Sequence, residues 1–476
     1  MFNANNLYQL GIPRDREIVG LALKGANKAL SDGVNGTDIA AILEELSLSE
    51  HPLEVDLGNA LGYLSDLAAK LSEARKSHRL FFERKSPVLW KSWADDGVES
   101  SAVQQMINAC RLPISFGGAL MPDAHTGYGL PIGGVLAVEN AVIPYAVGVD
   151  IACRMRISIL DIPYEEYDQR KQNLTDALES QTMFGVGVHF DKNNRLDHKV
   201  MEHHSWNEIH VLKEFFQKAH SQLGTSGSGN HFVEFGKLAV DRDIDEPGLK
   251  IKAGTYLALL SHSGSRGAGE AVAKYYSSVA MSYHHELPQE LKHLAWLYMD
   301  SVEGQEYWEA MQLMGLYASA NHELIHKRII DYLGCSTLGY VENHHNFAWK
   351  EMYDNKELII HRKGATPAGL GVLGVIPGSM GTSGFIVRGK GNPDSFSSCS
   401  HGAGRLMSRK AAFKTLNQEN MLQLLGDKGI TLLSGELDES PEVYKDIEKV
   451  MTSQHDLVDI LARFDPRLVK MSGKKF

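Results

Sequence analysis

Apolar residues in the first part of the chain recur every three or four positions, which is the spacing of an amphipathic helix. This spacing predicts a helix over residues 38–46 that is capped by Thr37. Its inward-facing side chains are predicted to be Ile39, Ile42, Leu43 and Leu46. A second helix is predicted by Leu57, Leu61, Leu64, Ala68 and Leu71. Because this part has no cluster of polar residues, residues 1–85 are predicted to be an N-terminal helical region used for packing or oligomerisation.

From residue 86 the pattern changes to short β-rich runs separated by glycine-dense loops. The β-rich runs are residues 130–135, 155–160, 256–261, 357–361 and 385–387. Longer helical stretches lie between them at residues 208–223, 269–283 and 305–333. This alternation predicts a mixed α/β (α+β) fold with one large domain over residues 86–476. Many of the 45 glycines fall in the loops, where they let a backbone approach a phosphate closely, although such loops are also simple tight turns.

Composition narrows the function classes. The chain of 476 residues has 48 basic and 59 acidic side chains, and the net charge of −11 argues against indiscriminate nucleic-acid binding. It has no run of about 18 apolar residues and no secretory signal pattern, so we expect no membrane association. The four cysteines are far apart, which predicts a reducing, cytoplasmic environment. Histidine is frequent, at 21 residues, and favours metal or acid–base chemistry.

Four polar clusters carry candidate metal ligands. Asp150 and Cys153 are three residues apart, and a carboxylate with a thiolate suits manganese, cobalt or zinc. The other clusters are histidine-bearing segments at residues 227–234, 261–266 and 343–346. Each alone is more often a capping acid, a core histidine or a solvated turn than a metal site. In the last segment either histidine is a candidate, with Asn346 orienting a neighbour. Together the four clusters predict a shell for one or two divalent ions.

Two later segments suit anions. Residues 376–384 form a loop of backbone N–H and hydroxyl donors that lacks the lysine of a Walker A loop. His401 follows and precedes a glycine turn and two arginines, Arg405 and Arg409. A neutral imidazole is nucleophilic near pH 7, and its attack on phosphorus yields a phosphoramidate, while arginine pairs with phosphate oxygens. The alternative is that His401 only begins a helix.

These segments, in this order, resemble the RtcB family of RNA ligases over residues 86–476. The matching blocks are Met121-Pro122-Asp123-Ala124-His125, Val147-Gly148-Val149-Asp150 leading to Cys153, Gly229-Asn230-His231-Phe232 with Glu234, His262-Ser263-Gly264-Ser265-Arg266, His345-Asn346, Pro377-Gly378-Ser379-Met380 and His401-Gly402-Ala403-Gly404-Arg405. The order of the blocks is specific, although each block alone is not.

The resemblance implies an RtcB-type catalytic domain with two Mn²⁺ ions and GTP as cofactors. It implies metal ligands at Asp150, Cys153, His231, His262 and His345, with Cys153 bridging, and a guanylylated histidine at His401. The guanine nucleotide is expected to contact Asn230, Glu234, Asn346, Gly378, Ser379, Met380, Gly402, Gly404, Tyr444 and Lys470.

The reaction that the resemblance implies joins RNA 3′-phosphate or 2′,3′-cyclic phosphate ends to 5′-hydroxyl ends, with an activating protein partner left open. The chain departs from the family pattern at Ala152, Arg154 and Gly384. Two alternatives remain: a metal-dependent phosphoesterase acting on RNA termini, which does not need His401, and a non-catalytic protein that binds RNA ends.

Overall fold

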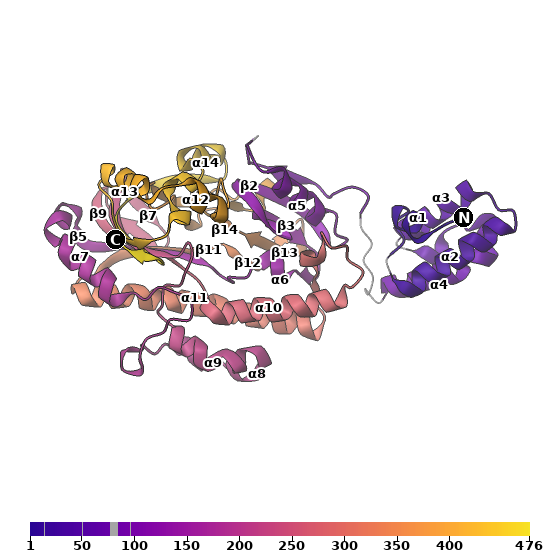
Figure 1. The fold of residues 1–476 in the computed structure, drawn as a ribbon, viewed down its shortest axis with the longest axis horizontal. Helices are drawn as coiled ribbons and strands as arrows, with labels where there is room; N and C mark the ends of the chain where they lie inside the picture. The colour runs from indigo at the N-terminus through magenta and orange to yellow at the C-terminus, as the bar shows by residue number, and fades with distance from the viewer. Residues whose placement is uncertain (14, 50, 77–83, 96) are drawn as a thin grey trace.

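The computed structural model describes residues 1–13, 15–49, 51–76, 84–95 and 97–476 (Figure 1). Four helices form a separate group at one end of the molecule: α1 (Ala4–Gln9), α2 (Arg16–Ser31), α3 (Gly36–Leu48) and α4 (Leu61–Lys76). They enclose an apolar core of their own, to which Leu7, Ile18, Leu43 and Leu64 belong. In the described residues no helix is long and apolar enough to cross a membrane.

Two details of this helical group differ from the sequence patterns. Helix α3 begins at Gly36 and is capped by Asn35, whose side-chain oxygen accepts a hydrogen bond from the Thr37 amide at 2.9 Å, so the predicted Thr37 cap is wrong by two residues. Helix α2 has no counterpart among the predicted helices. The proposed division at residue 85 stays a prediction, and residues 77–83 just before it lie outside the described residues.

The remainder of the chain is built on two sheets. The first has the strand order β1-β2-β3-β13-β12, and its members are β1 (Trp90–Ser92), β2 (Ser115–Tyr128), β3 (Leu130–Val138), β13 (Lys356–Lys363) and β12 (Asn346–Tyr353). Its strands pair antiparallel except for β1 with β2. Helix α5 (Ser100–Cys110) packs against β2 and β3.

The second sheet has nine strands. Its main path is β11 (Thr337–His344), β5 (Arg154–Pro163), β9 (Gly254–Ser263), β6 (Phe232–Val240), β19 (Val458–Met471), β16 (Gly384–Gly389) and β15 (Leu373–Ile376). Two strands extend it, β18 (Thr431–Gly435) and β20 (Lys474–Lys475). Val135 of β3 and Val387 of β16 belong to one buried cluster, so the two sheets share part of their core.

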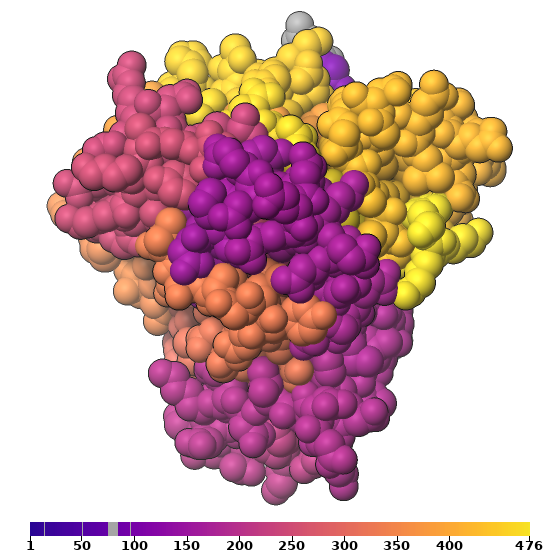
Figure 2. All heavy atoms as spheres, turned by 90° about the vertical axis from the view of Figure 1, so that its left-hand side faces the viewer, coloured from indigo at the N-terminus to yellow at the C-terminus, as the bar shows by residue number. Residues whose placement is uncertain are grey.

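The other helices pack on the sheets or on one another. They are α6 (Pro144–Val147), α7 (Tyr167–Gln181), α8 (Ser205–Glu208), α9 (His210–Gln222), α10 (Arg266–Tyr283), α11 (Val302–Leu333), α12 (Arg409–Thr415), α13 (Gln418–Asp427) and α14 (Ile447–Ser453). Short strand pairs join β4 (Ala141–Val142) to β10 (Leu297–Tyr298), β7 (Ile244–Glu246) to β8 (Leu249–Ile251), and β14 (Ala365–Pro367) to β17 (Ser398–Ser400). Figure 2 shows the end of the molecule opposite the N-terminal helices, where the magenta segment with α8 and α9 projects downward.

The mixed α/β class is confirmed, and every predicted β-rich run lies inside a strand. One predicted helix is divided. Residues 208–223 form the end of α8 and then α9, because Ile209 is extended, with φ −92° and ψ 121°, and buries its side chain in the main core.

Candidate metal and nucleotide site

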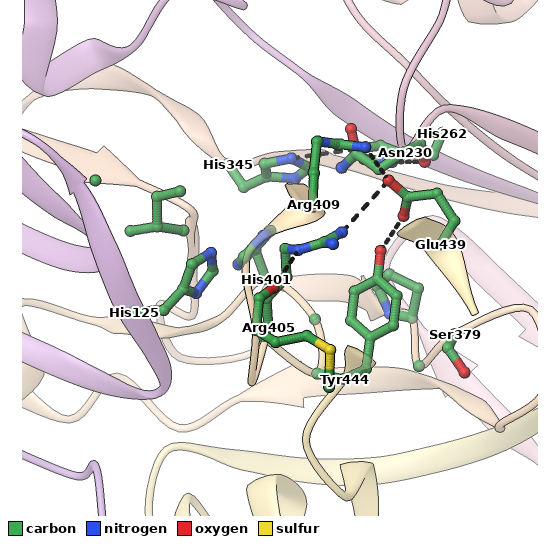
Figure 3. A pocket seen from close by; sticks show the side chains of 18 of the residues that line it. His125, Asn230, His262, His345, Ser379, His401, Arg405, Arg409, Glu439 and Tyr444 are labelled. Atoms are coloured by element: carbon green, nitrogen blue, oxygen red, sulfur yellow. Dashed lines mark hydrogen bonds and ion pairs between the residues drawn. The ribbon is translucent and has the colours of Figure 1, made fainter. Parts of the chain in front are cut away.

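A pocket of about 670 Å³ opens where the ends of β5, β6 and β9 meet the loop that follows β17 (Figure 3). Ten of the predicted site residues line it: Asn230, His262, His345, Gly378, Ser379, Met380, His401, Gly402, Gly404 and Tyr444. These residues come from segments as far apart as 230 and 444 in the sequence, so the fold brings distant blocks to one cavity.

The predicted metal ligands gather around the Cys153 thiol. Its sulfur lies 3.0 Å from Nε2 of His262 and 3.4 Å from Nε2 of His231. Nε2 of His231 also lies 3.0 Å from a carboxylate oxygen of Asp150, and Nε2 of His262 lies 3.4 Å from Nε2 of His345. All five predicted ligands therefore meet in one cluster, which we call the cysteine–histidine cluster.

Strand pairing produces this cluster. His262 on β9 pairs with Met155 on β5 and with Phe232 on β6, which places Cys153 and His231, each next to the start of a strand, beside it. The Asp150 carboxylate comes so close to Gly264 that a Cβ atom at that glycine would lie 2.3 Å from its oxygen. A side chain at residue 264 would therefore displace the carboxylate.

The donor set fits a divalent cation. Burial lowers the pKa of His262 to about 3 and holds that of His345 well below its usual value, so both imidazoles are neutral at pH 7, as metal ligation requires. The buried Nδ1 atoms of His231 and His345 have no hydrogen-bond partner within the described structure. Burial, followed by the nearby Asp150 charge, raises the pKa of the Cys153 thiol, a cost that a bound cation would offset by favouring thiolate.

Of the two adjacent histidines, His344 and His345, the second belongs to the cysteine–histidine cluster. His345 joins the cluster, and its ring centroid lies 4.8 Å from that of His401. The His344 ring instead stacks against Trp349, with centroids 5.1 Å apart. Asn346 donates a hydrogen bond to the Asp150 carbonyl oxygen and accepts one from the Gly364 amide. Its side chain holds neighbouring backbone and does not line the pocket.

His401 is oriented by Asp123, a residue of the block at 121–125 to which the sequence pattern assigned no role. This carboxylate is fully buried on β2, and one of its oxygens lies 2.6 Å from Nδ1 of His401. The same oxygen accepts hydrogen bonds from the amides of His401 and Gly402 at 3.0 and 3.2 Å. Nδ1 therefore carries the proton, and Nε2 keeps a free lone pair. The sequence feature that could have pointed to Asp123 is the Met-Pro-Asp-Ala-His block, in which this aspartate follows an apolar run.

Arginines and carboxylates neutralise one another on the side of the pocket that contains Tyr444. The Glu439 carboxylate is buried and contacts Arg405, Arg409 and the Tyr444 hydroxyl (Figure 3). Arg409 also pairs with Asp438. The charge of both arginines is therefore already compensated, and a phosphate would have to compete with these carboxylates for them.

Besides Asn346, two more of the predicted nucleotide contacts lie outside the main pocket. Glu234 lines a small adjoining cavity together with Phe232, Ser379 and Met380, and burial holds its pKa well above the usual value. Lys470 points away: its ammonium donates to the carbonyl oxygens of Leu178 and Glu179, at 2.8 and 3.2 Å. The neighbouring Val469 and Met471 face the small cavity because side chains alternate along β19. The structure does not bring Lys470 to the nucleotide side.

The departures from the family pattern have visible structural effects. Ala152 has φ of +56°, a left-handed conformation that glycine adopts more readily. Arg154 is buried and pairs with Glu342 at 2.9 Å, which joins β5 to β11 beside the cluster. Ser383, next to Gly384, donates to Asp465 at 2.6 Å and not into the pocket.

The fold and site define an α/β protein with a cluster of candidate metal ligands next to a histidine whose Nδ1 lies against a buried carboxylate. A family model described as tRNA-splicing ligase RtcB matches residues 105–472. The chain is 33% identical over 414 residues to the RNA-splicing ligase RtcB of Escherichia coli K12, covering 81% of this chain and 97% of that protein. It is also 33% identical over 417 residues to the tRNA-splicing ligase RtcB of Nanoarchaeum equitans, covering 73% and 86%. The chain belongs to the RtcB family.

Proposed function

We propose that this protein is an RNA ligase that depends on GTP and Mn²⁺. It joins RNA 3′-phosphate or 2′,3′-cyclic phosphate ends to 5′-hydroxyl ends through a guanylylated His401. Membership of the RtcB family supports the RNA ligase class. The observation that carries the finer proposal is the buried Asp123 carboxylate on Nδ1 of His401, in the same pocket as the cysteine–histidine cluster.

In the first step Nε2 of His401 attacks the α-phosphorus of GTP. A bond forms between nitrogen and phosphorus, and the bond to pyrophosphate breaks. Asp123 holds the imidazole in the tautomer that leaves Nε2 unprotonated, and it offsets the positive charge that develops on the ring. The guanine base is assigned to the side of the pocket near Glu234, with the loop at residues 378–380 around the nucleotide.

Asp150, Cys153, His231, His262 and His345 would hold two manganese ions, which when bound supply charge stabilisation to the phosphoryl oxygens. The RNA 3′-phosphate, formed where necessary by opening a cyclic phosphate with water, then takes GMP from His401. Finally the 5′-hydroxyl oxygen bonds to the RNA terminal phosphorus, GMP leaves with its electron pair, and the hydroxyl proton passes to solvent.

The test is incubation with α-labelled GTP and Mn²⁺, followed by denaturing electrophoresis. We expect label on the wild type and on a His455→Ala control, which removes an exposed histidine, and none on His401→Ala. If the wild type binds metal but takes no label, the covalent step is refuted for the isolated chain. The phosphoesterase, or a requirement for an activating protein, then becomes the better explanation.

A further inference from the structure

The pocket continues past His401, on the side away from Glu439 and Ser379. Figure 3 shows His125 on the opposite side of His401 from these two residues. This part of the pocket, which we call the distal lobe, is lined by Glu99, His125, Thr126, Gly127, Tyr128 and Lys363. None of these residues has a role in the first steps of the proposed reaction.

The aromatic ring of Tyr128 lies in the distal lobe, and most of its surface is exposed. Tyr128 is 69% exposed, and its ring meets the His293 ring edge-on, with centroids 5.7 Å apart. His293 is supported in turn by Tyr145, at 4.5 Å between centroids. The turn after Tyr128 sits tightly on the same segment, because a Cβ atom at Gly129 would lie 2.7 Å from the His293 carbonyl oxygen. The ring therefore has one supporting contact and leaves the rest of its surface open to a ligand.

A lysine side chain contacts the backbone of the same tyrosine. The Lys363 side chain is buried on β13, and its ammonium donates to the Tyr128 carbonyl oxygen at 2.5 Å. Within the described residues it forms no ion pair with a carboxylate, unlike Arg405 and Arg409 across the pocket. An exposed aromatic face near a lysine that is not paired with a carboxylate is a combination that suits single-stranded nucleic acid.

The geometry of phosphoryl transfer indicates which strand belongs here. In the proposed joining step GMP is the leaving group and lies on the Glu234 side of His401. In an in-line displacement the attacking oxygen approaches from the side opposite the leaving group. The 5′-hydroxyl oxygen therefore has to enter from the distal lobe.

We propose that the distal lobe binds the RNA strand that ends in the 5′-hydroxyl, with its first nucleobase stacked on Tyr128 and its backbone beside Lys363. This inference rests on the proposed ligase function. It assigns a substrate strand to a part of the pocket and a stacking contact to one side chain.

The experiment isolates the joining step. A 3′-strand that already carries GMP on its terminal phosphate is mixed with excess enzyme, and the rate is measured against the concentration of the 5′-hydroxyl strand. Loss of a base–aromatic stack predicts that Tyr128→Leu raises the half-saturating concentration about 5- to 100-fold, whereas Tyr128→Phe stays near wild type. Tyr332→Leu, at an exposed tyrosine on α11 outside the pocket, is the matched control.

A strand whose first 5′ nucleotide lacks its base tests the contact directly. With this strand the half-saturating concentration of the wild type is expected to rise by the same factor. That of Tyr128→Leu is expected to rise no further. The assignment would be overturned if removing the base raised the half-saturating concentration equally in the wild type and in Tyr128→Leu. It would also be overturned if the half-saturating concentration of the 3′-strand changed instead. Because the wild type alone gives the first result, the test does not depend on the variant folding.

Label transfer from GTP is measured in the same wild-type and Tyr332→Leu preparations. If these lack label transfer, the proposed function fails. If they have it but show no dependence on the first base, only the distal-lobe assignment fails.

Discussion

The N-terminal helices and the two sheets are stabilised in different ways. In the helices the packed residues are close in sequence, and side-chain caps such as Asp15 and Asn35 begin α2 and α3. In the sheets the residues of the site come from points more than 250 positions apart, as Asp123 and His401 show. The first region therefore needs only contacts among helices that lie within 76 residues of one another, whereas the second depends on strand pairing between distant segments, and damage to one should leave the other working.

The largest expected effect is at the carboxylate under His401. Asp123→Asn removes the charge that supports the imidazolium and permits the wrong tautomer, so label transfer from GTP should slow by about 10²–10⁴-fold. Single-turnover labelling measures this. Asp394→Asn, which removes a surface partner of Lys91, is the control and should stay within about twofold of wild type. Equal rates for Asp123→Asn and the wild type would contradict the orienting role.

Lys363 should make the stability of the sheet region depend on pH. Burial lowers its pKa from 10.5 to about 7, so the unfolded chain binds the extra proton between these values and stability rises with pH across that window. Lys363→Met removes the cost of burying the charge and should be more stable than wild type at pH 7, by about 2–4 kcal/mol. This difference in the free energy of unfolding between Lys363→Met and the wild type should shrink toward pH 10.5.

Urea unfolding of the wild type and Lys363→Met at pH 7 and pH 9.5 measures this difference. Lys350→Met, at a lysine on the neighbouring strand β12 that is exposed, provides the control. A difference between wild type and Lys363→Met that does not change with pH would contradict the burial argument.

Cys153→Ser should weaken Mn²⁺ binding at least about tenfold, because a direct ligand contributes no less than the groups that orient ligands. Titration calorimetry with Mn²⁺ alone gives the affinity without any activity measurement. Cys335→Ser alters a cysteine outside the cysteine–histidine cluster and should bind like wild type. Similar affinities for Cys153→Ser and wild type would remove Cys153 from the ligand set.

The smallest effect on activity is expected from damage to the helices. A Cβ atom at Gly25 on α2 would lie 2.2 Å from the Tyr63 carbonyl oxygen, so Gly25→Ala should separate α2 from α4. Gly20→Ala on the same helix meets nothing within 4 Å and is the control. Helix unfolding, followed by hydrogen exchange, should be easier only in Gly25→Ala, while label transfer stays within about twofold in both variants. A large loss of labelling would show that the two regions are coupled.

Prediction from sequence succeeded where one short segment contained the whole signal. The β-rich runs and the helical stretches at 269–283 and 305–333, which lie inside α10 and α11, were predicted from local patterns that need only neighbouring residues. It failed where distant contacts decide, as at Ile209, where a buried side chain interrupts a helical pattern. The residue pattern alone also left His344 and His345 open, because both suit a metal. The family resemblance implied His345, and the packing of His344 against Trp349 agrees with it.

The sequence by itself determined the fold class, the order of the family blocks and the donor types available for a cation and a nucleotide. These follow from residue type and spacing, which are properties of the chain before it folds. Only the tertiary structure decided that Asp123 holds His401, that Lys470 faces α7, and that the pocket extends beyond His401 to Tyr128. The physical reason is that pairing between strands far apart in sequence sets which side chains face one another, and no local pattern records that pairing.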